Sequence, residues 1–236
     1  MNGTLITALL RQRLTSPLRL AFLVMAMTFP LLIVAADPSS GFAAVETSLV
    51  FAWIFGAGMI GQDTSSGVLQ LLLARPVRRD VYALSRWFAV SLATAAAAVA
   101  QVGLAALILS ARGARPEPGA VGFAWANHVT SAFGATAPLL LLSTFTPGIG
   151  DLGLWWLIYM CGGILQMAGG AFHSPAVLQA GHEVQDFLNP MIDFAKVIGP
   201  ATSWYEVLAY LSSVTLSLAL AIVILNRKEL SYASAA

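Results

Sequence analysis

The chain has 236 residues, of which 58% are hydrophobic and only 10% are charged, and its mean hydropathy is +0.79. A soluble globular protein of this length needs more charged residues to cover its surface, so the composition excludes an ordinary water-soluble domain. The net charge of +1 and the pI near 7.9 provide no basic field, and we therefore expect no nucleic-acid partner.

The N-terminal residues 4–16 carry leucine and isoleucine on one helical face, with Arg11, Gln12 and Arg13 beside it. Ser16 and Pro17 then interrupt the pattern. An amphipathic stretch of this length predicts a short helix that lies in the membrane interface.

Long apolar stretches, separated by polar or turn-forming residues, recur along the rest of the chain. A hydrocarbon core of roughly 30 Å needs about 20 apolar residues per helix, so the length permits about six crossings and no separate soluble domain. We therefore predict an all-α integral membrane protein with a single transmembrane domain over residues 1–236. The six predicted transmembrane helices cover about residues 18–36, 42–60, 87–110, 121–145, 152–171 and 204–225.

Positive charge is distributed unequally between the two sides of this topology. With six spans both termini share one side, and that side receives nine basic residues: Arg11, Arg13, Arg19, Arg75, Arg78, Arg79, Arg86, Arg227 and Lys228. The other side receives three: Arg112, Arg115 and Lys196. The positive-inside rule then predicts a multi-pass protein of the cell inner (cytoplasmic) membrane with both termini in the cytoplasm. The segment 62–86 is cytoplasmic in this topology, and residues 172–203 form an external loop.

The segment from Asp63 to Arg79 combines an acid, a flexible glycine, a short apolar run and a basic cluster after a proline. It is too short to span a membrane but apolar enough to pack against another surface. A cytoplasmic helix of this kind, joined to two spans, is suited to dock into a groove on a soluble partner and to pass motion to the membrane helices. The alternative interpretation is a solvated loop whose arginines only fix the topology.

This stretch resembles the type 2 ABC transporter permease family. Members of that family typically show an acid four residues before a glycine, an apolar run, a Pro-Val-x-Arg element and a basic residue that opens the next span. The matching positions here are, in order, Asp63, Gly67, Val68 to Leu73, Pro76-Val77, Arg79 and Arg86. Asp63 stands where glutamate is more frequent, Val68 where threonine is common and Arg86 where lysine is usual. The stretch from Arg11 to Pro17 also resembles the amphipathic elbow helix of the family.

The resemblance implies a permease that pairs with a second permease subunit, identical or homologous, and with cytoplasmic ABC ATPase subunits. It makes 67–79 the coupling helix that contacts the ATPase. It also implies that the transporter moves a substrate outward. The coupling residues implied are Asp63, Gly67, Leu69, Leu72, Arg75, Pro76, Arg78 and Arg79. The chain itself has no phosphate-loop motif, because its lysines, Lys196 and Lys228, do not follow a glycine. We therefore expect ATP and Mg to be bound by the partner ATPase, with no cofactor and no catalytic residue in this chain.

Two further groups of polar residues are candidates for chemistry. His182 and Asp186 are four residues apart in the external loop, near His173, and would share a helical face, which makes the three of them weak candidates for metal binding. The alternative is a polar external loop without a metal. Polar residues inside predicted spans are costly in lipid, and either hydrogen-bond between helices or line a substrate path: Glu46, Gln101, Asn127, His128 and Gln166.

Two alternative functions stay open at this point. One is an intramembrane enzyme, a hydrolase or transferase that uses His128 or a loop histidine with a nearby carboxylate, although no paired-glutamate or His-x3-His pattern occurs within a span. The other is an ABC-type permease that performs mechanical work on a partner in the envelope. The sequence does not identify the substrate, and it does not decide between a homodimer and a heterodimer of permeases.

Overall fold

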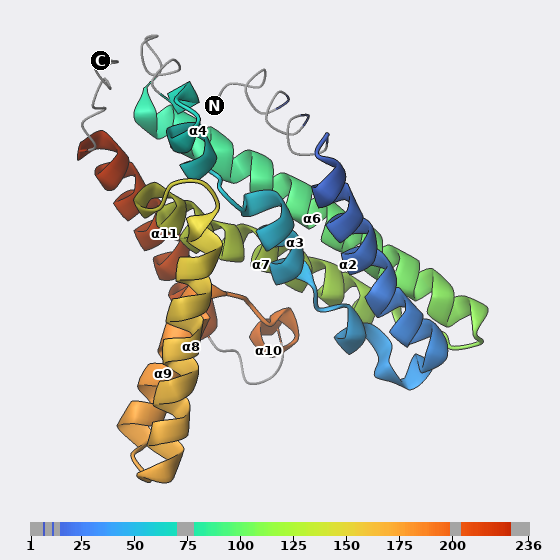
Figure 1. Cartoon of the computed structure of the whole chain (residues 1–236). Coiled ribbons are helices and arrows are strands. Elements are labelled where there is room, and N and C mark those ends of the chain that lie inside the picture. The colour runs from blue at the N-terminus through green and yellow to red at the C-terminus, as the bar shows by residue number, and fades with distance from the viewer. Residues whose placement is uncertain (1–6, 8–10, 12–14, 70–77, 199–203, 228–236) are drawn as a thin grey trace.

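The computed structural model describes residues 7, 11, 15–69, 78–198 and 204–227. Every regular element in this part of the chain is a helix, which confirms the predicted all-α class (Figure 1). The predicted interfacial helix over residues 4–16 falls almost entirely outside the described residues. In chain order the helices are α2 (Pro17–Ala36), the 3-10 helix η1 (Pro38–Val45), α3 (Ser48–Gly56), α4 (Gly61–Ser65), α6 (Arg79–Ala111), α7 (Pro118–Phe145), α8 (Gly150–Ala171), α9 (Pro175–Leu188), α10 (Phe194–Ile198) and α11 (Trp204–Arg227).

Five stretches are long and apolar enough to cross a membrane: α2, the stretch Pro38–Ser65, α6, α8 and α11. Large apolar side chains are exposed on α2, α8 and α11, for example Phe29, Met167 and Leu208. Serine, threonine and glutamine side chains are instead buried between the helices. This distribution fits a lipid environment, and the chain is therefore a multi-pass membrane protein.

The predicted count of six spans is not confirmed, because α7 is not among the five. With 28 residues α7 is long enough to cross, but it contains Asn127 and His128 together with several serines, threonines and glycines. It lies at the centre of the bundle, where it contacts α3, α4, α6, α8, α9, α10 and α11. A helix surrounded by other helices needs less apolar character than one that faces lipid.

The second predicted span, residues 42–60, is not one continuous helix. The 3-10 helix η1 ends at Val45, α3 ends at Gly56, and the short helix α4 begins only at Gly61. Between α3 and α4 the chain turns at Gly58, whose φ of +65° lies in the left-handed region that glycine adopts without a steric penalty. The stretch from Pro38 to Ser65 is therefore a broken helix.

The predicted external loop, residues 172–203, contains the helix α9, which forms a helical hairpin with α8. Figure 1 shows α9 folded back along α8, so that the two helices form an arm that diverges from α2 and α6. Their backbones approach closely, since a Cβ atom on Gly169 would lie 2.4 Å from the backbone nitrogen of Leu178. After α9 the chain reaches the middle of α7, where the carbonyl of Pro190 lies against Gly134.

Candidate functional site

The predicted coupling segment begins in α4 and ends at the first turn of α6. Residues 70–77 fall outside the described residues, so the structure does not describe the predicted coupling residues Leu72, Arg75 and Pro76. The other predicted coupling residues are described: Asp63, Gly67, Leu69, Arg78 and Arg79. In Figure 1, α4 lies at the end of the bundle where α2 begins and α11 ends, which we call the terminal end.

A buried ion pair joins the two ends of this segment. The carboxylate of Asp63 on α4 accepts hydrogen bonds from the guanidinium of Arg86 and from the hydroxyl of Tyr82, both on α6. Asp63 is 4% exposed and Arg86 is 3% exposed. The free-energy cost of removing such charges from water is compensated only when they are paired and hydrogen-bonded, so the contact fixes α4 against the first turns of α6. The sequence did not point to Tyr82, although it stands four residues before Arg86 on the same helix face.

The predicted coupling residue Arg79 connects the start of α6 to the end of α11. Its guanidinium donates to the carbonyl oxygens of Leu225 at 2.8 Å and of Asn226 at 3.1 Å. The last carbonyls of a helix have no partner within the helix, and a cation at that end also interacts favourably with the helix dipole. Its neighbour Arg78 is exposed and pairs with Asp80 at 2.7 Å.

The apolar run of the segment starts against the core. Gly67 has a φ of +72° and is surrounded by open space, so it turns the chain after α4. Val68 is exposed, whereas Leu69 is buried in the same apolar cluster as Phe55 and Tyr82. In the described part of the run, Leu69 therefore packs on the bundle, whereas the side chain of Val68 is exposed.

Polar side chains from α7 and α8 support the break between α3 and α4. The hydroxyl of Ser143 accepts from the backbone nitrogens of Ile60 at 2.8 Å and Gly61 at 2.9 Å. A carboxylate oxygen of Asp151 accepts from the nitrogen of Gly58 at 2.8 Å. Non-helical backbone within a membrane bundle needs such partners because no water satisfies it. The sequence analysis singled out neither Ser143 nor Asp151.

The first membrane helix joins the same region through Arg19. Its guanidinium donates to the carbonyl of Ala57 at 3.3 Å and to the side-chain oxygen of Gln62 at 3.1 Å. Polar contacts at the terminal end thus link α2, the α3–α4 break, α6, α8 and α11. The predicted coupling segment contacts α6 and α11 directly, and α2 and α8 contact the α3–α4 break that precedes it.

Three of the polar residues predicted inside spans form hydrogen bonds between elements. Gln101 on α6 donates to the carbonyl of Ala26 on α2 at 2.8 Å. Gln166 on α8 donates to Gln185 on α9 at 2.9 Å. The side-chain oxygen of Asn127 accepts from the backbone nitrogen at residue 194, 3.0 Å away. These contacts match the expected role of polar residues that join helices.

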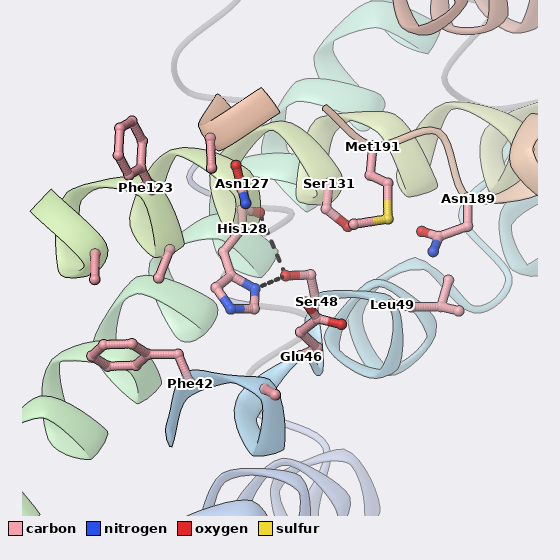
Figure 2. Close-up of a pocket in the computed structure, with 14 residues that line it drawn as sticks. Phe42, Glu46, Ser48, Leu49, Phe123, Asn127, His128, Ser131, Asn189 and Met191 are labelled. Atoms are coloured by element: carbon pink, nitrogen blue, oxygen red, sulfur yellow. Dashed lines mark hydrogen bonds between the residues drawn. The ribbon is translucent and has the colours of Figure 1, made fainter. Parts of the chain in front are cut away.

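The other two polar residues from that group, Glu46 and His128, line a cavity in the half of the bundle away from the terminal end (Figure 2). The Nδ1 atom of His128 lies 2.6 Å from the hydroxyl of Ser48, which is the first residue of α3. Both Ser48 and His128 are buried. The contact fixes the orientation of the imidazole ring at the cavity wall.

The candidate metal residues of the predicted external loop do not form a larger cluster. His182 and Asp186 both lie on α9, while His173 follows α8 with a φ of +52°. Partial burial raises the pKa of Asp186, the nearby Glu183 raises it further, and His182 opposes both effects. Among the residues that the structure describes, no group of three or more histidine, cysteine, aspartate or glutamate side chains could hold a metal ion.

The geometry therefore offers a terminal end that connects five elements and a separate cavity that contains a carboxylate. The first can transmit movement, and the second has room for a small molecule.

Comparison with known proteins gives no family for this chain, because no family model matches it and no curated protein matches its sequence.

Proposed function

We propose that this chain is the permease subunit of an ATP-binding-cassette transporter of type 2. A separate cytoplasmic ATPase hydrolyses ATP with Mg, and the permease couples that reaction to outward movement of a substrate across the cytoplasmic membrane. The terminal end faces the cytoplasm, and residues 67–79 contact the ATPase. A second permease chain, identical or homologous, completes the transporter.

The observation that carries this proposal is the pairing of Asp63 with Arg86. These two residues bound the sequence motif, and both are buried in the bundle. A solvated loop whose arginines only set the topology would leave both charges in water, where an ion pair contributes about 0 to 1 kcal/mol. Burial of a charge at each end instead favours a segment that must stay rigidly joined to the membrane helices.

The contacts on either side of the ion pair agree with a segment that receives force. Leu69 packs in the core, and Arg79 holds the end of α11. Val68 and Arg78 are exposed beside them, with Arg78 paired to the neighbouring Asp80, and both are accessible to a soluble partner. A partner that moves this surface would move α4, α6 and α11 together.

A cysteine cross-linking experiment tests the predicted contact. Cys161 is exposed and is first replaced, as Cys161→Ser. Arg78→Cys and Arg112→Cys are then compared, since both arginines are exposed and lie at opposite ends of α6. In native membranes treated with a thiol-to-amine cross-linker, we expect Arg78→Cys to capture a protein with a phosphate-loop sequence, identified by mass spectrometry. Arg112→Cys should not capture it. Capture of the ATPase at neither position, or equally at both, would contradict the proposal.

The hydrogen bond between Ser48 and His128 favours a second candidate function, an intramembrane hydrolase. A serine within 2.6 Å of an imidazole nitrogen is the arrangement of a nucleophile and its base. The purified chain would then react with a fluorophosphonate probe without ATP, and Ser48→Ala would abolish the labelling. Absence of labelling in the unmodified chain rejects this candidate.

A further inference from the structure

We propose that the cavity beside Glu46 is a binding site for a small organic ammonium ion. The cavity has a volume of about 390 Å³ and lies among the end of η1, the start of α3, α7 and the stretch that follows α9. Small-molecule pockets have volumes of roughly 300 to 1,000 Å³. The cavity is at the lower end of that range, so it suits a small amine and is too small for a whole lipid or a folded peptide.

Glu46 gives the cavity its charge. It lies between η1 and α3, and Figure 2 shows it next to Ser48 on one wall. Neither lysine nor arginine is present among the described residues that line the cavity. The side chain of Glu46 is exposed, so its carboxylate can be reached from outside the cavity that it lines. A carboxylate without a basic neighbour attracts a cation and repels an anion. Within a membrane bundle such a residue also marks a ligand path more often than a purely structural site.

An unsatisfied acceptor indicates that the ligand carries N–H groups. The side-chain oxygen of Asn189 is buried and has no hydrogen-bond partner. Such atoms are uncommon in folded proteins, because the loss of hydration is not compensated. Several occur among the described residues, and Asn189 is the one of them that lines this cavity. Asn189 lines the cavity, and a primary or secondary ammonium group would supply the missing donor. A quaternary ammonium ion has no N–H group and could not.

Aromatic and sulfur-containing side chains complete the lining. Figure 2 shows Phe42 and Phe123 on one side of the cavity and Met191 toward the other. A ring face attracts a cation, and a thioether is a polarisable contact for an apolar group. The combination of a carboxylate, a free acceptor and aromatic rings fits an amine with a compact apolar body.

A second cavity provides the necessary comparison. It is larger, about 860 Å³, and is lined by the acidic residues Glu183, Asp186, Asp193 and Glu206. Its charge is partly neutralised, because Lys196 lies 3.3 Å from Asp193 and 4.0 Å from Glu206. A cation that binds the chain without specificity would also occupy this second cavity, and the experiment must separate the two.

Calorimetric titration of the full chain in lipid nanodiscs tests the ligand class. The probes are phenethylamine, which is cationic, 2-phenylethanol, which has a similar shape without charge, and 3-phenylpropionate, which is anionic. We expect phenethylamine to bind at least about tenfold more tightly than either of the others, because only it pairs with a carboxylate. Equal binding of the amine and the alcohol, or no binding of the amine, would overturn the proposal.

Matched variants locate the site. Glu46→Gln should weaken phenethylamine binding about tenfold or more, whereas Glu183→Gln removes one carboxylate from the second cavity and should leave the affinity unchanged. Asn189→Leu should also weaken phenethylamine binding, because it removes the acceptor oxygen without changing the charge of the cavity. Thermal unfolding of each variant in the same nanodiscs checks that it is folded. A loss of affinity in Glu183→Gln with none in Glu46→Gln would place the ligand in the second cavity and reject the proposal.

Binding at this cavity does not depend on the proposed transporter function. If the chain is a permease, the bound amine would be its cargo, and only that step rests on the proposed function. The titration uses the isolated chain without ATP, whereas the cross-linking experiment uses residues at the other end of the bundle. Failure of either result therefore leaves the other intact.

Discussion

At the terminal end, the buried carboxylate of Asp63 is paired within the chain, whereas the cavity is lined by the exposed side chain of Glu46 and by Asn189, whose buried side-chain oxygen has no hydrogen-bond partner among the described residues. The carboxylate of Asp63 binds both Arg86 and Tyr82. The oxygen of Asn189 binds nothing in the described structure. The difference teaches how to separate two roles of polar residues in a membrane bundle. A paired group holds helices together, and an unpaired group facing a cavity is available to a ligand.

Removal of one partner from the buried ion pair should produce the largest effect. Arg86→Ala leaves the carboxylate of Asp63 buried and without its cation. We expect the free energy of unfolding to fall by about 3 to 5 kcal/mol. Unfolding in mixed micelles with increasing sodium dodecyl sulfate, followed by circular dichroism, measures this difference.

The control for this variant is Arg112→Ala, an exposed arginine at the other end of α6, which should change stability by less than about 0.5 kcal/mol. The double variant Asp63→Leu with Arg86→Met removes both charges and should recover most of the lost stability. If Arg86→Ala unfolds like the unmodified chain, the terminal end does not differ from the cavity in the way described.

A substitution at the helix break should have an intermediate effect. A Cβ atom on Gly61 would lie 2.5 Å from the carbonyl oxygen of Thr146 and 2.6 Å from that of Gly148. Gly61→Ala must therefore displace the backbone between α7 and α8, at a cost of about 1 to 3 kcal/mol. The same unfolding assay measures it.

Gly103→Ala is the matched control, since that glycine lies inside α6 with open space around it. Alanine favours a helix interior over glycine by roughly 0.5 to 1 kcal/mol, so this variant should be slightly more stable. A loss of stability in both variants would show that glycine matters for a reason other than the close approach at the break.

The pH dependence of Asp186 should give the smallest effect. Its pKa is raised above the ordinary value of 3.8 by burial and by Glu183. The folded state therefore binds a proton that the unfolded state has released, and stability falls as pH rises from about 3.8 through the raised pKa. Asp186→Asn removes this dependence, so the variant should gain stability relative to the unmodified chain at neutral pH.

Unfolding curves of both proteins between acid and neutral pH measure this gain, which should vanish below the ordinary pKa of the carboxyl. The control is Asp37→Asn, because Asp37 lies in a turn between α2 and η1 and its carboxylate accepts from the neighbouring Ser39. A gain for Asp186→Asn that is the same at all pH values would contradict the assigned cause.

The long helices could be predicted because lipid imposes a length and an apolar composition on each of them. Predicted boundaries for α2, α8 and α11 agree with the structure within a few residues. The start of α6 was missed, since the prediction began the span at its apolar part near residue 87, whereas the helix begins at Arg79. A polar first turn outside the apolar stretch has no hydropathy signal.

The broken helix could not be predicted from local sequence. Its backbone groups are satisfied by Ser143 and Asp151, which lie 82 or more residues further along the chain. The ion pair could be predicted from the sequence only in part. The motif gave the positions of Asp63 and Arg86, but only the packing of α4 on α6 reveals that the two side chains meet.

The attachment of Arg79 to the end of α11 has a mechanical consequence. The described elements on either side of residues 70–77 are attached to the bundle by two different kinds of contact. One is a buried ion pair between α4 and α6, and the other is a pair of hydrogen bonds to carbonyls near the surface. Movement of the start of α6 would therefore reach α4 through buried side chains and α11 through its last carbonyl groups.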